Sequence, residues 1–107
     1  MALILIRFSP SKPKKGEPVK VSVVVRHPME PGTRKDENGQ IIPANYINEI
    51  EVTLNGERVA RVNPGRGVSA NPLFAFMIAA EPGEVKVRYT DTTGESGEKA
   101  KTLTVAE

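Results

Sequence analysis

The 107-residue sequence contains no cysteine and no tryptophan, and its one histidine is His27. Without cysteine the chain can form no disulfide, no thiolate metal site and no cysteine nucleophile. Zinc sites normally use two or more His or Cys ligands, so His27 with the nearby Glu30 and Asp36 makes a poor metal set. We therefore expect no metal site, and the absence of thiols leaves the redox compartment open.

Catalytic and phosphate-binding motifs are also missing. The serines show no nucleophile-elbow pattern, and Glu49 and Glu51 share one face of an expected strand, where they would meet solvent. The basic stretches Lys12–Gly16 and Gly65–Gly67 lack the interleaved aromatic side chains on which nucleic-acid bases stack. We expect no enzyme activity, no cofactor and no nucleic-acid binding in this chain.

No long hydrophobic run is present. The apolar opening Met-Ala-Leu-Ile-Leu-Ile ends at Arg7. A signal peptide needs roughly 7–15 apolar residues behind a positive segment, and a membrane helix needs about 20. We expect neither, so a role outside the cytoplasm would require the chain to travel with another protein.

Charge is unevenly distributed along the chain. Residues 1–35 hold eight basic and two acidic residues, whereas residues 36–107 hold seven basic and eleven acidic ones. A basic surface can attract an acidic partner, or it can simply be solvated. Both interpretations stay open from the sequence alone.

The regular segments alternate with a period of two, which is typical of half-buried antiparallel strands. In residues 18–26 the valines at 19, 21, 23 and 25 share one face. Turn signals such as Asn55-Gly56 separate the segments. Strands are expected over residues 2–8, 18–26, 47–54, 57–62, 72–80, 84–91 and 98–106. About seven short strands predict an all-β, immunoglobulin-like antiparallel β-sandwich, with residues 1–107 as one domain.

Two segments depart from this alternation. Residues 27–46 form a long connection, and long loops in compact domains are usually functional or disordered. Met29, Ile41, Ile42 and Tyr46 lie within it, so we expect it to be pinned down. Residues 72–80 are apolar on both faces, which predicts either a central strand or one covered by a partner. A second chain is the more economical cover in so small a sandwich.

A long and idiosyncratic pattern begins in this connection: His27-Pro28-Met29-Glu30, Gly32, Arg34-Lys35-Asp36, Gly39, Ile42-Pro43-Ala44 and Tyr46-Ile47-Asn48. It continues through Asn55-Gly56 to Ser69-Ala70-Asn71-Pro72, Phe74 and Phe76. The pattern resembles the SoxZ family over essentially the whole chain.

The resemblance implies an immunoglobulin-type sandwich that pairs with SoxY, whose C-terminal cysteine arm bears the sulfur intermediates of thiosulfate oxidation. It implies a heterodimer or higher heteromer in the periplasm, exported on the partner's signal, with transient contacts to other Sox enzymes. It further implies that this chain contacts no membrane and carries out no covalent chemistry. Our candidates for apolar contact with SoxY are Leu73, Phe74, Phe76 and Met77. The candidates for polar or rim contact are Met29, Arg34, Lys35 and Asp36.

Alternatives remain beside this interpretation. The chain could be a generic accessory or adhesion sandwich that binds a surface protein or glycan, although it has few aromatic side chains for sugar stacking. It could also lend Arg34 or His27 to a neighbour's active site. The cluster Arg34-Lys35-Asp36 is either local ion pairing or an interface element. Phe74 and Phe76 could belong to the core instead of the interface.

Overall fold

The computed structural model describes residues 3–64 and 67–106. The strands in these ranges are β1 (Ile4–Ser9), β2 (Pro18–Val25), β3 (Ile47–Leu54), β4 (Glu57–Val62), β5 (Leu73–Ala79), β6 (Gly83–Asp91) and β7 (Ser96–Leu103). Their bounds follow the expected ones closely, and Gly65 and Arg66 of the second basic stretch lie outside the described residues. Within the described ranges, no helix has the length and apolar character needed to cross a membrane.

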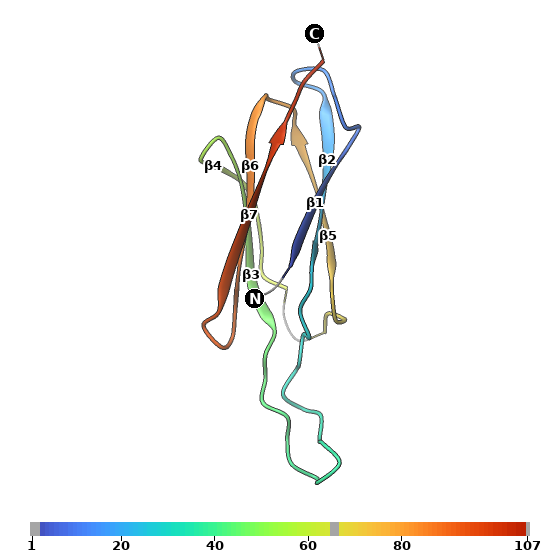
Figure 1. The fold of residues 1–107 in the computed structure, drawn as a ribbon, viewed down its shortest axis with the longest axis vertical. Helices are drawn as coiled ribbons and strands as arrows, with labels where there is room; N and C mark the ends of the chain where they lie inside the picture. Colours follow the sequence, from blue (N-terminus) through green and yellow to red (C-terminus); the bar gives the residue numbers. More distant parts are fainter. Residues whose placement is uncertain (1–2, 65–66, 107) are drawn as a thin grey trace.

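The strands form two antiparallel sheets packed face to face (Figure 1). One sheet has the order β1-β2-β5 and the other the order β4-β3-β6-β7. The all-β, immunoglobulin-like sandwich expected from the sequence is therefore confirmed. Its fourth strand pairs with β3 in the four-stranded sheet, whereas constant-type immunoglobulin domains place that strand in the other sheet. β1 and β7 lie together at one side, where Lys101 Nζ donates a hydrogen bond to the Ile6 carbonyl oxygen at 3.1 Å.

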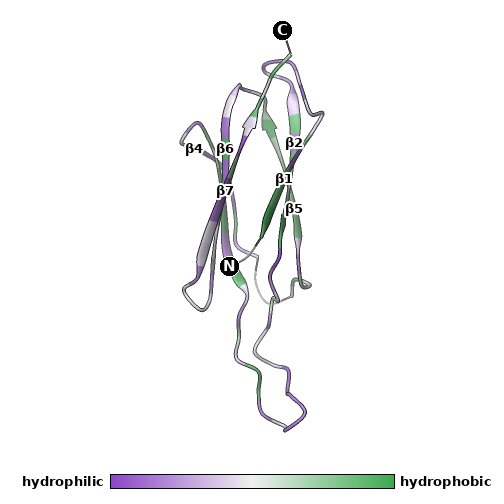
Figure 2. Ribbon diagram, viewed as in Figure 1, coloured by the Kyte–Doolittle hydropathy of each residue, from purple (hydrophilic) through white to green (hydrophobic). Residues whose placement is uncertain are grey.

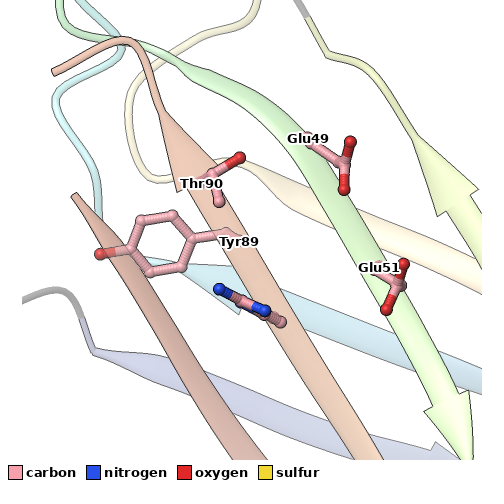
Figure 3. A pocket seen from close by; sticks show the side chains of 5 residues that line it. Glu49, Glu51, Tyr89 and Thr90 are labelled. Atoms are coloured by element: carbon pink, nitrogen blue, oxygen red, sulfur yellow. The ribbon is translucent and has the colours of Figure 1, made fainter. Parts of the chain in front are cut away.

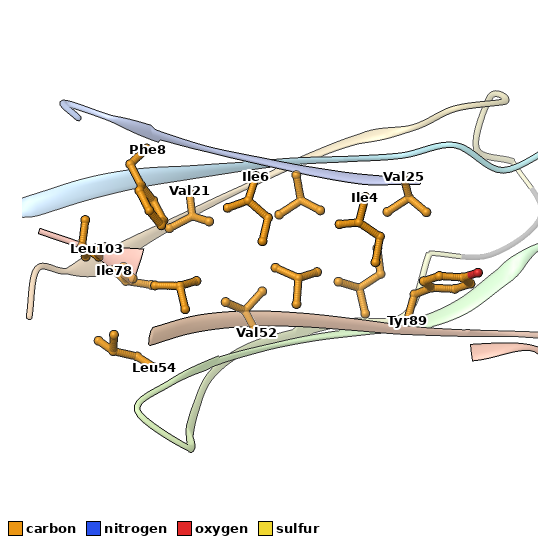
Figure 4. Packing of buried hydrophobic residues seen from close by; sticks show 14 of the residues in the cluster. Ile4, Ile6, Phe8, Val21, Val25, Val52, Leu54, Ile78, Tyr89 and Leu103 are labelled. Atoms are coloured by element: carbon orange, nitrogen blue, oxygen red, sulfur yellow. The ribbon is translucent and has the colours of Figure 1, made fainter. Parts of the chain in front are cut away.

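The core between the sheets is mostly aliphatic (Figure 4). The alternating valines of β2 are all fully buried, as the period of two predicts. The facing sheet contributes Ile50 and Val52 from β3 and Val85 and Val87 from β6, which are also fully buried. Phe8 and Tyr89 add the aromatic contribution. Each sheet therefore turns one set of alternate side chains inward and presents the other set to its surroundings.

The connection between β2 and β3 projects beyond the end of the sandwich as two extended arms; we call residues 28–46 the finger (Figure 1). Glu30 and Asn45 exchange backbone hydrogen bonds of 2.7 and 2.9 Å across the arms. At the tip, Asp36 Oδ1 accepts the backbone N–H groups of Asn38 and Gln40 at 2.9 and 3.0 Å. The finger is thus ordered by its own hydrogen bonds along its length.

The expectation that apolar side chains pin the connection is confirmed at its base only. Met29 is buried in the core and Tyr46 packs against it, whereas Ile41 near the tip is 62% exposed. The sheets also differ in character: β1 is predominantly hydrophobic and β7 predominantly hydrophilic in Figure 2.

Replacing Ile50 with Ala should destabilise the fold by about 2–5 kcal/mol, because it leaves a cavity in the closed core. Ile41→Ala is the matched control at an exposed site and should change stability by less than about 0.5 kcal/mol. Urea unfolding followed by far-UV circular dichroism measures both. Equal midpoints for the two variants would contradict the placement of the core.

Candidate protein-docking surface

The outer face of the β1-β2-β5 sheet is apolar although nothing in the described chain covers it. Leu5, Val24 and Leu73 lie side by side across the three strands, and Leu73 and Met77 are 64% and 65% exposed. We define the outer apolar face as Leu3, Leu5, Val24, Leu73, Ala75, Met77 and Ala79. Contiguous exposed apolar surface on a soluble protein marks an interaction site.

Two shallow hollows mark this face at opposite ends of β5. One, of about 480 Å³, is lined by Leu5, Ile6, Arg7, Ser22, Val24, Leu73 and Lys101. The other, of about 240 Å³, is lined by Gly16, Pro18, Met77, Ile78 and Ala79. The smaller hollow is lined mainly by apolar side chains, and the larger one combines apolar side chains with Arg7, Ser22 and Lys101. Side chains of a docked protein could fill both.

The charged residues on the three strands of this sheet are all positive. β1, β2 and β5 contain no Asp or Glu. Arg7 and Lys20 point outward from β1 and β2, and the exposed Arg26 follows at the end of β2. The basic first third of the sequence is thus partly gathered on one sheet face. Acids occur only beyond the strand ends, at Glu17 before β2 and at Glu81 after β5, where Glu81 pairs with Lys15 at 3.8 Å. An apolar surface whose own strands carry only cations complements an apolar surface bordered by acids.

The outer face of the other sheet differs, because its charges pair with one another. Arg61 donates to Glu49 at 2.9 Å, and Arg58 lies 3.9 Å from Glu51. A hollow of about 190 Å³ on this face is lined by Glu49, Glu51, Arg88, Tyr89 and Thr90 (Figure 3). Both carboxylates lie on β3 and have arginine partners on β4, as surface charges of a solvated sheet commonly do.

The apolar interface candidates divide by strand alternation. Leu73 and Met77 point outward from β5, whereas Phe74 and Phe76 are half-buried and pack against the core. Sequence reasoning did not include Leu3, Leu5 or Val24 in the surface. The sequence did contain a signal for Leu3 and Leu5: residues 3–6 are apolar on both faces of the strand, as are residues 72–80.

The polar candidates lie on or at the base of the finger. Met29 is 4% exposed, and its Sδ accepts the backbone N–H of Ile47 at 3.4 Å, so its side chain is inside the domain. Arg34, Lys35 and Asp36 are exposed. They therefore lie on a different part of the molecule from the outer apolar face.

Arg34 forms a local ion pair. Its Nε donates to Glu30 Oε2 at 3.1 Å, and its Nη2 contacts Glu30 Oε1. The hydrogen bonds from Arg34, assisted by its positive charge, hold the pKa of Glu30 below its usual value. The same pairing raises the pKa of Arg34. In this structure the local-pairing interpretation of Arg34 applies.

His27 lies buried beneath the finger, and both of its ring nitrogens are engaged. Its Nδ1 accepts the backbone N–H of Met29 at 3.1 Å, so Nε2 carries the proton and donates to Asp91 Oδ2 at 2.9 Å. The edge of the ring meets Tyr89, with 6.1 Å between ring centroids. With 4% of its surface exposed, His27 is not placed to reach a neighbour's active site. Within residues 3–64 and 67–106, no three His, Cys, Asp or Glu residues form a group that could hold a metal ion.

Asp91 is the other half of this buried pair. Burial alone would raise its pKa, but the Thr93 hydroxyl, His27 and the backbone N–H groups of Thr93 and Glu95 donate hydrogen bonds to the carboxylate. These bonds outweigh burial and hold the pKa of Asp91 below its usual value. The carboxylate therefore stays charged and fastens the β6–β7 turn to the end of β2.

Comparison with known proteins identifies a family and a fold. Residues 6–102 match the family model described as sulphur oxidation protein SoxZ. No curated protein sequence matches the chain. A superoxide reductase (neelaredoxin) from Ignicoccus hospitalis is 21% identical, with a TM-score of 0.68 over 96% of this chain and 80% of that one. A superoxide reductase from Nanoarchaeum equitans is 19% identical, with a TM-score of 0.60 over 95% of this chain and 90% of that one. At such identities the likeness concerns the fold, which can host unrelated functions.

Asp91→Asn should lower the stability at neutral pH by about 1–3 kcal/mol. The Asn Nδ2 would face the Nε2–H of His27, and the Met29 N–H already occupies Nδ1, so two donors would meet. The stabilisation from a lowered carboxyl pKa is complete above the unfolded value of about 3.9 and is lost as pH falls through the folded value. The difference between wild type and variant should therefore shrink below about pH 4.

Urea unfolding at a series of pH values measures this difference. Asp36→Asn is the control, because an exposed amide oxygen can accept the same backbone hydrogen bonds at the finger tip. It should change stability by less than about 0.5 kcal/mol. A difference for Asp91→Asn that stays constant down to the lowest pH would contradict the assigned role of the carboxylate.

Proposed function

The chain belongs to the SoxZ family of sulphur oxidation proteins, and we propose that it is the non-catalytic subunit that holds the SoxY carrier protein. SoxY bears the sulfur intermediates of thiosulfate oxidation on a C-terminal cysteine arm. The pair works in the periplasm as a heterodimer or higher heteromer. It is exported there by means of the partner's export signal, and other Sox enzymes contact it transiently.

The outer apolar face is the observation that carries this proposal. Its aliphatic and methionine side chains stand in water in the isolated chain, with Leu73 and Met77 more than half exposed. Covering them releases roughly 25 cal/mol for each Å² of apolar area. A permanently bound subunit would gain this stabilisation. An apolar centre with charged residues around it is the expected anatomy of a stable interface.

The residue content of the chain fits a supporting role. The sequence has no cysteine, so a thiol-borne sulfur intermediate has to be carried by a partner. His27 is committed to Met29 and Asp91 inside the fold. Glycan binding, as in an adhesion module, favours exposed aromatic rings. Here Phe74 and Phe76 pack against the core, so the geometry favours a protein partner over a sugar.

The cations of the outer face indicate how the partner is attracted. Arg7, Lys20 and Arg26 have no carboxylate beside them on strands β1, β2 and β5. Complementary charge mainly accelerates association and excludes wrong partners. We therefore infer that the docking surface of the carrier has acidic residues around an apolar centre.

Leu73→Ser and Met77→Ser should each weaken binding to purified SoxY by more than about 1 kcal/mol, which is about fivefold in Kd. Both side chains are exposed, so the melting temperature of the isolated chain should hardly change. Val59→Ser on β4, an exposed apolar residue of the other sheet, is the matched control and should bind normally. Isothermal titration calorimetry measures the affinities. Wild-type affinity in both β5 variants would exclude this face as the interface.

Arg7→Gln and Lys20→Gln should lower the association rate constant several-fold at low ionic strength. The difference should fade in high salt, because exposed charges are then screened over a few ångströms. Arg88→Gln on β6 removes an equal charge from the outer face of the other sheet, where Arg88 lines the hollow with Glu49 and Glu51, and is the control. Stopped-flow or surface plasmon resonance at several salt concentrations tests this. An equal effect of all three substitutions would point to net charge and not to this face.

A further inference from the structure

Strand β5 ends the three-stranded sheet, and no strand in residues 3–64 and 67–106 pairs along its outer side. Two flanking hydrogen bonds fix the phase of its ladder with β2: Val25 N–H to Pro72 oxygen at 3.2 Å, and Ala80 N–H to Glu17 oxygen at 2.8 Å. Bonds in an antiparallel ladder recur at every second residue. Backbone groups that point toward β2 therefore belong to Phe74, Phe76 and Ile78.

The intervening residues of β5 direct their N–H and C=O groups away from β2, toward the open edge. They are Leu73, Ala75, Met77 and Ala79. The same residues contribute the outward side chains of the outer apolar face. The same alternate residues of β5 therefore present both unpaired backbone groups at the edge and apolar side chains on the outer face.

This edge is the least protected of the sheet edges. The seven residues of β5 include no charge, proline or glycine, and their register with β2 has no bulge. By contrast, β7 carries Glu98, Lys99 and Lys101, and β4 carries Arg58 and Arg61 beside a bulge in its pairing with β3. The edge of β1 lies against β7. Natural proteins use charges, prolines and bulges to prevent edge pairing, so their absence on β5 indicates an edge that is paired in use.

We propose that the carrier subunit binds by adding an extended segment along the outer edge of β5, which continues the β1-β2-β5 sheet into the partner. This inference rests on the proposed pairing with the carrier and specifies its mode. Backbone hydrogen bonds to Leu73, Ala75, Met77 and Ala79 align the segment. Its outward side chains extend the apolar face, and acids of the partner that lie over this face meet Lys20 on β2, the strand next to β5.

A second copy of this chain fits the edge less well. Two copies paired through β5 would join two sheets whose strands carry only positive charges, and like charges repel. An acidic partner removes this repulsion. The charge pattern therefore favours a different chain over self-pairing.

The test combines one substitution with one direct measurement on the complete chain and purified SoxY. Ala75→Pro removes a single outward N–H that the ladder with β2 does not use, and proline is tolerated on edge strands. Ala75→Val keeps the N–H and adds similar bulk. Ala75→Pro should weaken binding at least about tenfold, and Ala75→Val by less than about threefold.

Amide hydrogen exchange by NMR gives a readout that does not depend on a variant folding. In the free chain the amides of Ala75, Met77 and Ala79 should exchange quickly, and those of Phe74 and Phe76 slowly. In the complex the first set should become protected at least about tenfold. This alternation is the signature of an added strand.

The outcomes separate this inference from the proposal beneath it. A complex that forms without new protection of the alternate amides, and that tolerates Ala75→Pro, overturns strand addition while pairing with the carrier stands. Failure of the wild-type chain to bind SoxY at all overturns both. Protection that appears in the chain alone, with a dimer in analytical ultracentrifugation, assigns the edge to a second copy and also overturns the inference.

Discussion

The buried hydrogen bond between His27 and Asp91 joins the two sheets at the end of the sandwich from which the finger emerges. His27 follows β2 in one sheet, and Asp91 ends β6 in the other. The His27 carbonyl oxygen also accepts the N–H of Asn71, and the Asn71 side-chain oxygen accepts the N–H of His27. Three chain segments are therefore held at one point, and they include the segment that leads into β5.

From this point the backbone turns into the finger. Met29 has a φ of 51°, a left-handed conformation that non-glycine residues seldom adopt. Its N–H is bound to His27 and its side chain is buried, so packing and hydrogen bonding together hold this conformation. The finger is thus aimed by the core and not by contacts at its tip. The same buried base places the start of β5, and with it the outer apolar face, in a fixed position.

Much of the fold could be predicted from the sequence, because apolar side chains that recur at every second residue indicate which face of a strand is buried. The valines of β2 illustrate this, since all four are inside. The division of β5 into inward phenylalanines and outward Leu73 and Met77 was less accessible. Both sets are apolar, so the pattern does not reveal which set faces the core until the register with β2 pairs Phe74 and Phe76 with its buried valines.

The buried pair could not be found from the sequence for a different reason. His27 and Asp91 are 64 residues apart, and no local pattern links them. Their meeting depends on the pairing of β3 with β6 and on the packing of the two sheets. The role of Arg34 was likewise undecided, because a charge cluster looks the same in sequence whether its members pair locally or wait for a partner.

The uncharged edge of β5 has a consequence for how the protein must be produced. A flat, apolar strand edge can template pairing with any other exposed strand, so a surplus of free chain is exposed to aggregation. Under the proposed pairing, synthesis of this chain together with its partner would keep the edge of β5 covered and so limit aggregation.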